Sequence, residues 1–103
     1  MASNPRGRAP KLLSVRQRID RLDGQLLRLI NERAKLALLI GRIKKRRKWP
    51  VFDARREASV LRHVTRASRG PLSTNAIRKI FQTILTQCRR RQRDGKRRAV
   101  RGS

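Results

Sequence analysis

The amino-acid sequence predicts an all-α protein with three helices, one long, one short and one of medium length, assembled as an intertwined helical homodimer. Three observations lead to this prediction. An apolar seam with helical spacing extends over residues 14–46, helix-breaking residues at Pro50 and Gly70-Pro71 divide the rest of the chain, and no segment has a convincing strand pattern. The 103-residue chain has room for one domain.

The long helix is predicted from Ser14 to Arg46. Ser14 followed by Gln17 is a capping-box signature, which marks the expected start. The seam follows a regular 4-3-4-3 spacing through Val15, Ile19, Leu22, Leu26, Leu29, Arg33, Leu36, Ile40 and Ile43. Such a helix is about 48 Å long, and two shorter helices of the same chain cannot cover it. We therefore expect the chain to form an oligomer.

The two shorter helices have recognisable starts and stops. Asp53 is the expected N-cap of a helix over residues 54–68, and Gly70-Pro71 ends it. Ser73 is the expected cap of the third helix, whose apolar face reaches Gln92. That face consists of Ile77, Ile80, Phe81, Ile84, Leu85 and Cys88. The third helix is thus predicted to be the one of medium length.

The charge of the chain is strongly positive, with 30 Lys and Arg against 6 Asp and Glu, and a net charge of +24. Basic residues cluster at 44–48 and again from Arg89 to the C-terminus. We expect a central domain over residues 12–92, a disordered basic leader at 1–11 and a disordered basic tail at 93–103. The tail predicts an acidic partner or nucleic acid, although aromatic residues at 3% argue against recognition by base stacking.

Other classes of protein are disfavoured by composition. The single cysteine, Cys88, excludes an intramolecular disulfide framework, and with the single histidine it offers no metal site. No apolar run approaches the length of a membrane span, and the basic N-terminus leads to no signal-peptide core. We expect a cytoplasmic protein with no metal, no cofactor and no membrane partner.

One member of the apolar seam, Arg33, is charged. It lies eleven residues before Lys44, so on a helix the two point in nearly the same direction, about 16 Å apart along the axis. Ala37 lies between them and leaves space in which two long basic side chains could close on a small dianion. A buried salt bridge to a carboxylate of another helix is an equally good interpretation of Arg33.

Further polar residues are weak signals when taken singly. Arg16 lies about 25 Å from Arg33 and is rotated by roughly 100°, so it could serve only a neighbouring chain's pocket. An exposed first-turn arginine is the simpler interpretation of Arg16. In isolation Arg56 and Glu57 indicate capping and surface charge, and Gln92 is one amide that extends an apolar face.

Together, the order and spacing of these residues resemble the all-helical (AroQ-class) chorismate mutases. The resemblance covers roughly residues 12–92. It rests on Arg16, Ile19-Asp20, Leu22-Asp23, Leu26-Leu27, Leu29-Ile30-Asn31-Glu32-Arg33, Leu36-Ala37, Ile40-Gly41, Lys44, Pro50-Val51-Phe52-Asp53, Arg56-Glu57, Val60-Leu61, Gly70-Pro71-Leu72-Ser73, Ile77, Ile80-Phe81 and Ile84. Each motif is short, but their combined order is highly specific.

The resemblance implies a dimer with antiparallel long helices and two equivalent active sites that rearrange chorismate to prephenate in aromatic amino-acid biosynthesis. It implies that Arg33 binds a substrate carboxylate within its own chain. Arg16 would hold the second carboxylate in the partner's site. Cys88 stands where some members carry a serine that contacts a carboxylate, and a thiol is a poorer hydrogen-bonding group.

The remaining roles implied by the resemblance concern the reacting end of the substrate. Lys44 and Gln92 would hydrogen-bond the ether oxygen of the breaking bond, while Asp53 and Glu57 would bind the ring hydroxyl with support from Arg56. A pericyclic Claisen rearrangement requires no nucleophile, general base or metal. It requires restraint of the reactive conformer and stabilisation of the charge that develops on the ether oxygen.

Two alternatives remain open from the sequence. Isochorismate pyruvate lyases resemble the same family and use a similar basic pocket, but the set Asp53, Arg56 and Glu57 favours the mutase. The other alternative is a catalytically silent basic helical dimer that binds nucleic acid or an acidic partner.

Substitution of Arg33 or Lys44 separates the enzyme from the binding protein. If the chain is a mutase, Arg33→Ala or Lys44→Ala should abolish turnover of chorismate without unfolding the protein, as measured by absorbance and circular dichroism. If the chain only binds polyanions, either change should merely weaken a salt-dependent affinity.

Overall fold

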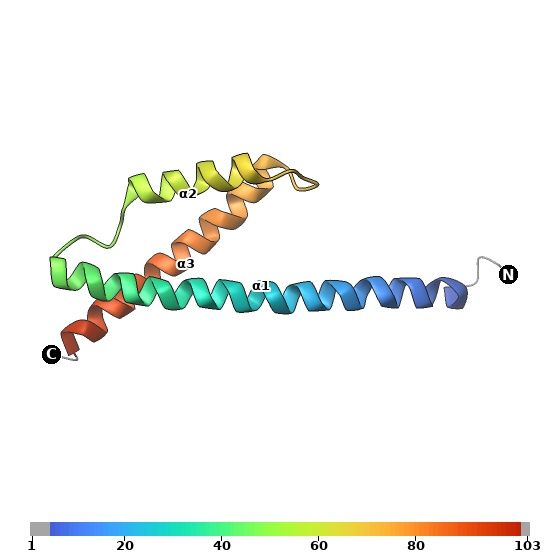
Figure 1. The fold of residues 1–103 in the computed structure, drawn as a ribbon, viewed down its shortest axis with the longest axis horizontal. Coiled ribbons are helices and arrows are strands. Elements are labelled where there is room, and N and C mark those ends of the chain that lie inside the picture. The colour runs from blue at the N-terminus through green and yellow to red at the C-terminus, as the bar shows by residue number, and fades with distance from the viewer. Residues whose placement is uncertain (1–4, 102–103) are drawn as a thin grey trace. The chain divides into compact units, whose positions relative to one another are not determined.

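The computed structural model describes the backbone of residues 5–101 and the side chains of residues 10–96. Three helices follow one another along the chain: α1 at Pro5–Arg47, α2 at Ala54–Ala67 and α3 at Thr74–Arg101 (Figure 1). Residues 5–101 contain no strand. The prediction of an all-α chain with a long, a short and a medium helix is confirmed. No helix within this range is both long enough and apolar enough to cross a membrane.

The helix start expected at Ser14 is wrong, because α1 begins at Pro5. A helix that begins upstream satisfies the N–H groups after Ser14 with backbone carbonyls, so Ser14 is not needed as a cap. Proline also suits the first position of a helix, where its missing N–H costs nothing. Of the leader expected to be disordered, residues 5–11 are helical and residues 1–4 lie outside the described residues.

The C-terminal end differs from expectation in the same way. α3 continues beyond Gln92 to Arg101, so residues 93–101 of the expected disordered tail are helical, and residues 102–103 lie outside the described residues. The helix continues because no proline interrupts the chain after Gln92 and lysine and arginine are good helix formers. The limits of the central domain at residues 12 and 92 stay predictions.

The chain divides into two compact units, residues 1–31 and residues 32–103. In the first unit the described element is the N-terminal part of α1, and every residue from 10 to 31 is exposed. The exposed residues include the apolar seam at Val15, Ile19, Leu22, Leu26 and Leu29. Residues 10–31 of α1 therefore present a hydrophobic face that no other described part of this unit buries.

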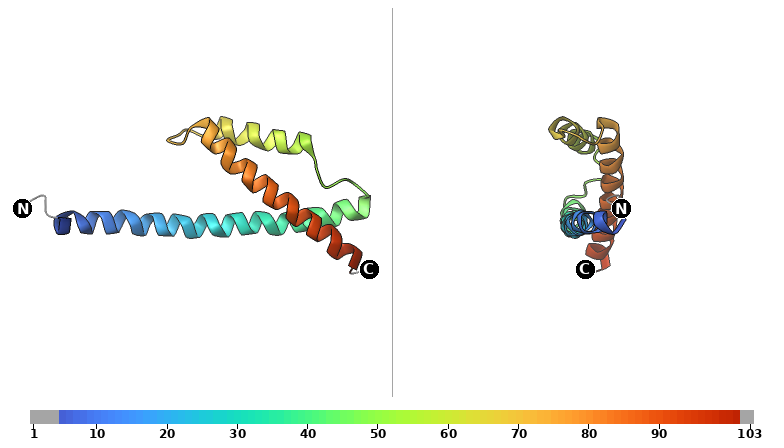
Figure 2. Two further views of the ribbon diagram at one scale, coloured as in Figure 1. Left: turned by 180° about the vertical axis from the view of Figure 1, so that it is seen from behind. Right: turned by 90° about the vertical axis from the view of Figure 1, so that its right-hand side faces the viewer.

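The second unit combines the C-terminal part of α1 with α2 and α3. The views in Figures 1 and 2 agree that α3 crosses this part of α1, and α2 packs against α3. Among the described apolar side chains only Ala37, Leu85 and Cys88 are buried. They lie on α1 and α3, so the small core of this unit follows the crossing of the two helices.

The crossing of α1 and α3 requires two glycines. A Cβ on Gly41 of α1 would overlap the backbone carbonyl of Gln92, and a Cβ on Gly95 of α3 would overlap the backbone carbonyl of Leu38. Both glycines are buried. The two backbones therefore contact each other directly at two places, which lie about one helical turn apart along each helix. Gln92 is held at one of these contacts.

The connections between helices use the expected caps. Asp53 accepts a hydrogen bond from the backbone N–H of Arg56 at 3.0 Å, and Ser73 accepts one from Ala76 at 3.0 Å. Both predicted N-caps are confirmed. After α1, Lys48 adopts a left-handed conformation with φ 56°, and the N–H of Trp49 donates to the carbonyl of Lys44 at 2.8 Å. This turn reverses the chain before α2.

A pair of glycine substitutions tests the crossing. Gly41→Ala or Gly95→Ala should lower stability by about 1–3 kcal/mol, because the added methyl group forces two backbones apart. The matched control is Gly24→Ala, where a Cβ has nothing within 4 Å and the gain in helix propensity is about 1 kcal/mol. Thermal unfolding measures all three variants. Equal melting temperatures for Gly41→Ala and Gly24→Ala would contradict the close crossing.

Candidate active site

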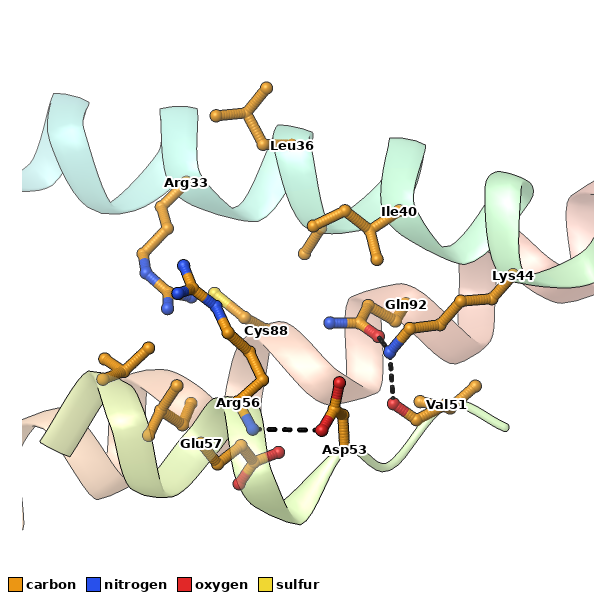
Figure 3. Close-up of a pocket in the computed structure, with 13 residues that line it drawn as sticks. Arg33, Leu36, Ile40, Lys44, Val51, Asp53, Arg56, Glu57, Cys88 and Gln92 are labelled. Carbon is orange, nitrogen blue, oxygen red and sulfur yellow. Dashed lines mark hydrogen bonds between the residues drawn. The ribbon is translucent and has the colours of Figure 1, made fainter. Parts of the chain in front are cut away.

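One pocket of about 290 Å³ lies among α1, α2 and α3 within the second unit (Figure 3). Its lining consists of Arg33, Leu36, Ala37, Ile40, Lys44, Val51, Asp53, Arg56, Glu57, Val60, Leu85, Cys88 and Gln92. Seven of the eight residues proposed from the sequence are in this set, and Arg16 is not. The pocket combines three cations and two carboxylates with an apolar floor, which suits a small anionic ligand that also carries a polar neutral group.

Lys44 is held by two acceptors inside the pocket. Its Nζ donates to the backbone carbonyl of Val51 at 2.6 Å and to Oε1 of Gln92 at 2.7 Å (Figure 3). An ammonium group has three N–H donors, so these two bonds leave one donor for a ligand. The two acceptors come from the α1–α2 connection and from α3, and together they restrict where the ammonium can lie.

The hydrogen bond from Lys44 also sets the orientation of the Gln92 amide. An ammonium can only donate, so the amide oxygen must face Lys44 and the NH₂ group must face the other way. Figure 3 shows the amide nitrogen of Gln92 directed into the pocket. Lys44 and Gln92 therefore present two adjacent donors to the same region, and the second is neutral.

The pKa of Lys44 is lowered from its ordinary value of 10.5, chiefly because burial penalises the cation. The carboxylates of Asp53 and Glu57 oppose this effect, and Lys96 adds to it. A partly desolvated cation interacts more strongly with a nearby anion than one in bulk water. The burial that lowers the pKa of Lys44 thus also strengthens the attraction between its ammonium group and an anionic ligand.

Arg33 and Arg56 form the other cationic part of the pocket. Arg33 comes from α1 and Arg56 from α2, and both side chains extend into the same pocket (Figure 3). Arg33 makes no ion pair with a carboxylate in the part of the chain that the structure describes. Because both cations line the same pocket, an anion bound there would be stabilised. Arg33 and Lys44 flank buried Ala37, as their spacing predicted.

The two carboxylates come from the N-cap of α2, Asp53, and from its first turn, Glu57. One oxygen of Asp53 caps that helix, and the second points into the pocket (Figure 3). Glu57 accepts from Nη1 of Arg89 through both of its oxygens, at 2.9 Å and 2.8 Å. Because Asp53 and Glu57 line the pocket beside Lys44, they can accept a hydrogen bond from a ligand hydroxyl.

Sequence reasoning missed two contributors to this site. Arg89 was grouped with the basic tail, although it lies four residues after Leu85 and three before Gln92, on the same face of α3. That spacing places Arg89 on the apolar face of α3, but it does not predict the pairing of Arg89 with Glu57. The Val51 carbonyl is a backbone group, and no side-chain pattern predicts which carbonyl an ammonium will reach.

For two predicted residues, Cys88 and Arg16, the structure gives a position that does not by itself support the role implied by the resemblance. Cys88 is buried at 4% exposure and lines the pocket as a free thiol. Arg16 is exposed on the part of α1 that belongs to residues 1–31. Its proposed contact with a ligand requires a second chain and stays a prediction.

The pocket belongs to an all-helical protein and its cations suit a small anion, and comparison with known proteins identifies the family. Residues 15–93 match the family model of chorismate mutase type II. The chain therefore belongs to the chorismate mutase type II family.

Curated relatives include larger proteins. The chain is 39% identical over 83 residues to a bifunctional chorismate mutase/prephenate dehydratase of Pseudomonas aeruginosa, which covers 76% of this chain and 23% of that protein. It is 37% identical over 75 residues to the protein of the same name from Escherichia coli K12, covering 72% of this chain and 19% of that one. The chain thus spans about a quarter or less of the length of these relatives.

Solved structures agree with this family. The chain is similar to a chorismate mutase from Thermus thermophilus, with 32% sequence identity and a TM-score of 0.74. The match covers 76% of this chain and 89% of form II of that protein, and 98% of form I.

The lowered pKa of Lys44 predicts an alkaline limit on catalysis. A lysine whose pKa is depressed loses its proton at a lower pH than a free lysine, so a step that needs the cation weakens as pH rises. We expect kcat to vary little around neutrality, and kcat/KM, which reports the pKa of the ligand-free protein, to fall on the alkaline side with a midpoint below 10.5. A pH–rate profile measures this. The profile of Lys35→Met, at an exposed position of α1, should be the same, and a steep loss of kcat between about pH 6 and 8 on folded protein would count against the role of Lys44.

Proposed function

We propose that this chain converts chorismate to prephenate by holding both substrate carboxylates and stabilising the charge that develops on the ether oxygen. The observation that carries this proposal is the hydrogen bond from Lys44 to Gln92, which presents an ammonium and an amide NH₂ to one region of the pocket. Membership of the chorismate mutase type II family supports it.

The first proposed effect is restraint of the substrate. Arg33 binds one carboxylate, and Arg16 of a second chain binds the other. With both ends held, the flexible enolpyruvyl ether is kept in the compact conformer from which the new carbon–carbon bond forms. Such restraint replaces the entropy that an unbound substrate must lose before it reacts. The guanidinium–carboxylate pairing also suits a site that binds dianions.

The second proposed effect is electrostatic. As the C–O bond breaks, negative charge develops on the ether oxygen, and the free donors of Lys44 and Gln92 meet it. Both donors are in place before the reaction, because Lys44 is anchored to Val51 and Gln92 lies at the helix crossing. Loss of one such donor typically costs about 10²–10³ in kcat. Asp53 and Glu57 accept the ring hydroxyl, with Arg56 supporting that end of the site.

We also propose that the active protein is an intertwined homodimer with shared sites. Between residues 10 and 96, seventeen large apolar side chains are at least 42% exposed, and most of them belong to α1. Their burial against a second long helix would contribute about 25 cal/mol per Å². The same arrangement would let Arg16 of one chain reach the other chain's pocket.

The reaction is tested by following chorismate disappearance by absorbance and identifying the product as prephenate. The alternative isochorismate pyruvate lyase is tested by supplying isochorismate and measuring pyruvate and salicylate. Asp53 and Glu57 in the pocket favour the mutase, because they offer acceptors for the ring hydroxyl. Salicylate formation in the absence of prephenate formation would overturn the proposal.

The basic surface supports a second function that is compatible with the first. With a net charge of +24, the chain could bind an acidic partner or nucleic acid through residues 93–103. Affinity for nucleic acid that falls steeply with salt, and that persists in Lys44→Ala, would support it. The cytoplasmic location expected from the sequence stays a prediction.

Mixed dimers test whether the sites are shared. Arg16→Ala and Lys44→Ala should each be inactive, but after mixing and refolding together about a quarter of wild-type activity should return, because each heterodimer has one intact site. If Arg16 acted within its own chain, no mixture would recover. Gel filtration and activity measurements on the mixture distinguish the two results.

A further inference from the structure

We propose that Arg89 is a positioning residue that fixes the carboxylate of Glu57 for the ring hydroxyl of the substrate. This inference deepens the proposed function and rests on it. Glu57 lines the pocket, whereas Arg89 does not. Arg89 would therefore act through Glu57 and not by touching the substrate.

The contacts of Arg89 tie together three separate segments. From α3 its Nη1 donates to both oxygens of Glu57 on α2, at 2.9 Å and 2.8 Å. Its guanidinium carbon also lies 4.8 Å from the ring centroid of Phe52, in the connection before α2. A guanidinium stacked on a ring and bonded to a carboxylate has little freedom to turn. Arg89 thus holds the carboxylate of Glu57 in a defined orientation.

The ion pair between Arg89 and Glu57 is better suited to orienting the Glu57 carboxylate than to stabilising the folded protein. Both side chains of the ion pair are 23% exposed, and partly exposed ion pairs contribute little to the free energy of folding. An unrestrained glutamate samples several rotamers, and all but one of them are lost when its carboxylate binds a hydroxyl, which costs conformational entropy. Each oxygen of Glu57 has a further lone pair, so it can accept a ligand hydroxyl while bonded to Arg89.

The test compares three variants on two substrates. Arg89→Met removes the charge and keeps the length of the side chain, and Arg89→Lys restores a donor. The matched control is Arg90→Met, which removes the same charge from the next, exposed position of α3. The substrates are chorismate and an analogue in which hydrogen replaces the ring hydroxyl. KM, kcat and the melting temperature are measured for each variant.

With chorismate, Arg89→Met should raise KM about fivefold and change kcat less than twofold, because a contact to the non-reacting hydroxyl is made equally in ground state and transition state. Arg89→Lys should recover most of the loss, and Arg90→Met should resemble the wild type. With the analogue, Arg89→Met and the wild type should have the same KM.

An equal increase in KM on both substrates, or the same increase in Arg90→Met, would overturn the role of Arg89 while leaving the mutase activity intact. Failure of Arg89→Lys to recover any of the loss would also overturn it. If the wild-type protein does not convert chorismate, the proposed function itself fails. The wild-type rate therefore separates the two failures before any variant is compared.

Discussion

The direct contact between the backbones of α1 and α3 is the constraint on which the rest of the site depends. It exists because Gly41 and Gly95 have no side chains at the crossing. Gln92 contributes its backbone to this contact and its side chain to the pocket, so the geometry of the amide follows from the packing of the helices. The Lys44 ammonium, three residues after Gly41, lies within hydrogen-bonding distance for the same reason.

A chain of local interactions extends from this crossing to the other side of the pocket. The left-handed residue Lys48 turns the chain back, so that the carbonyl of Val51 meets the ammonium of Lys44. Asp53 then starts α2, and the first turn of that helix brings Arg56 and Glu57 to the pocket. Arg89 joins this turn back to α3. The donors and acceptors are thereby fixed before any ligand arrives, which is the requirement for electrostatic stabilisation without reorganisation.

The sequence predicted the parts of this account that depend on periodicity and on capping chemistry. Three helices, the N-caps at Asp53 and Ser73, and the shared face of Arg33 and Lys44 follow from spacing along one helix at a time. The Arg89–Glu57 pair and the Val51 carbonyl depend on how segments far apart in the chain meet, and no single-helix pattern contains that information. The helix start was misplaced for a different reason, because a capping signal permits a helix to begin and does not require it.

The periodic apolar seam of α1 is the main support for the proposed homodimer. Large apolar side chains on α1 are exposed, and few apolar side chains are buried between residues 10 and 96. Conformational entropy must be offset by burial, and this chain buries little by itself. The proposed pairing of two long helices meets both needs, since it covers the seam and supplies Arg16 to the second carboxylate.

In the proposed mechanism, Lys44 and Gln92 together donate hydrogen bonds to the ether oxygen of the reacting bond. A crystal structure with a bicyclic ether dicarboxylate that imitates the transition state tests it most directly. In that complex we expect Nζ of Lys44 and Nε2 of Gln92 both about 3 Å from the ether oxygen, with Oε1 of Gln92 still bonded to Lys44. An ether oxygen remote from both donors, or a Gln92 amide turned away from the ligand, would contradict it.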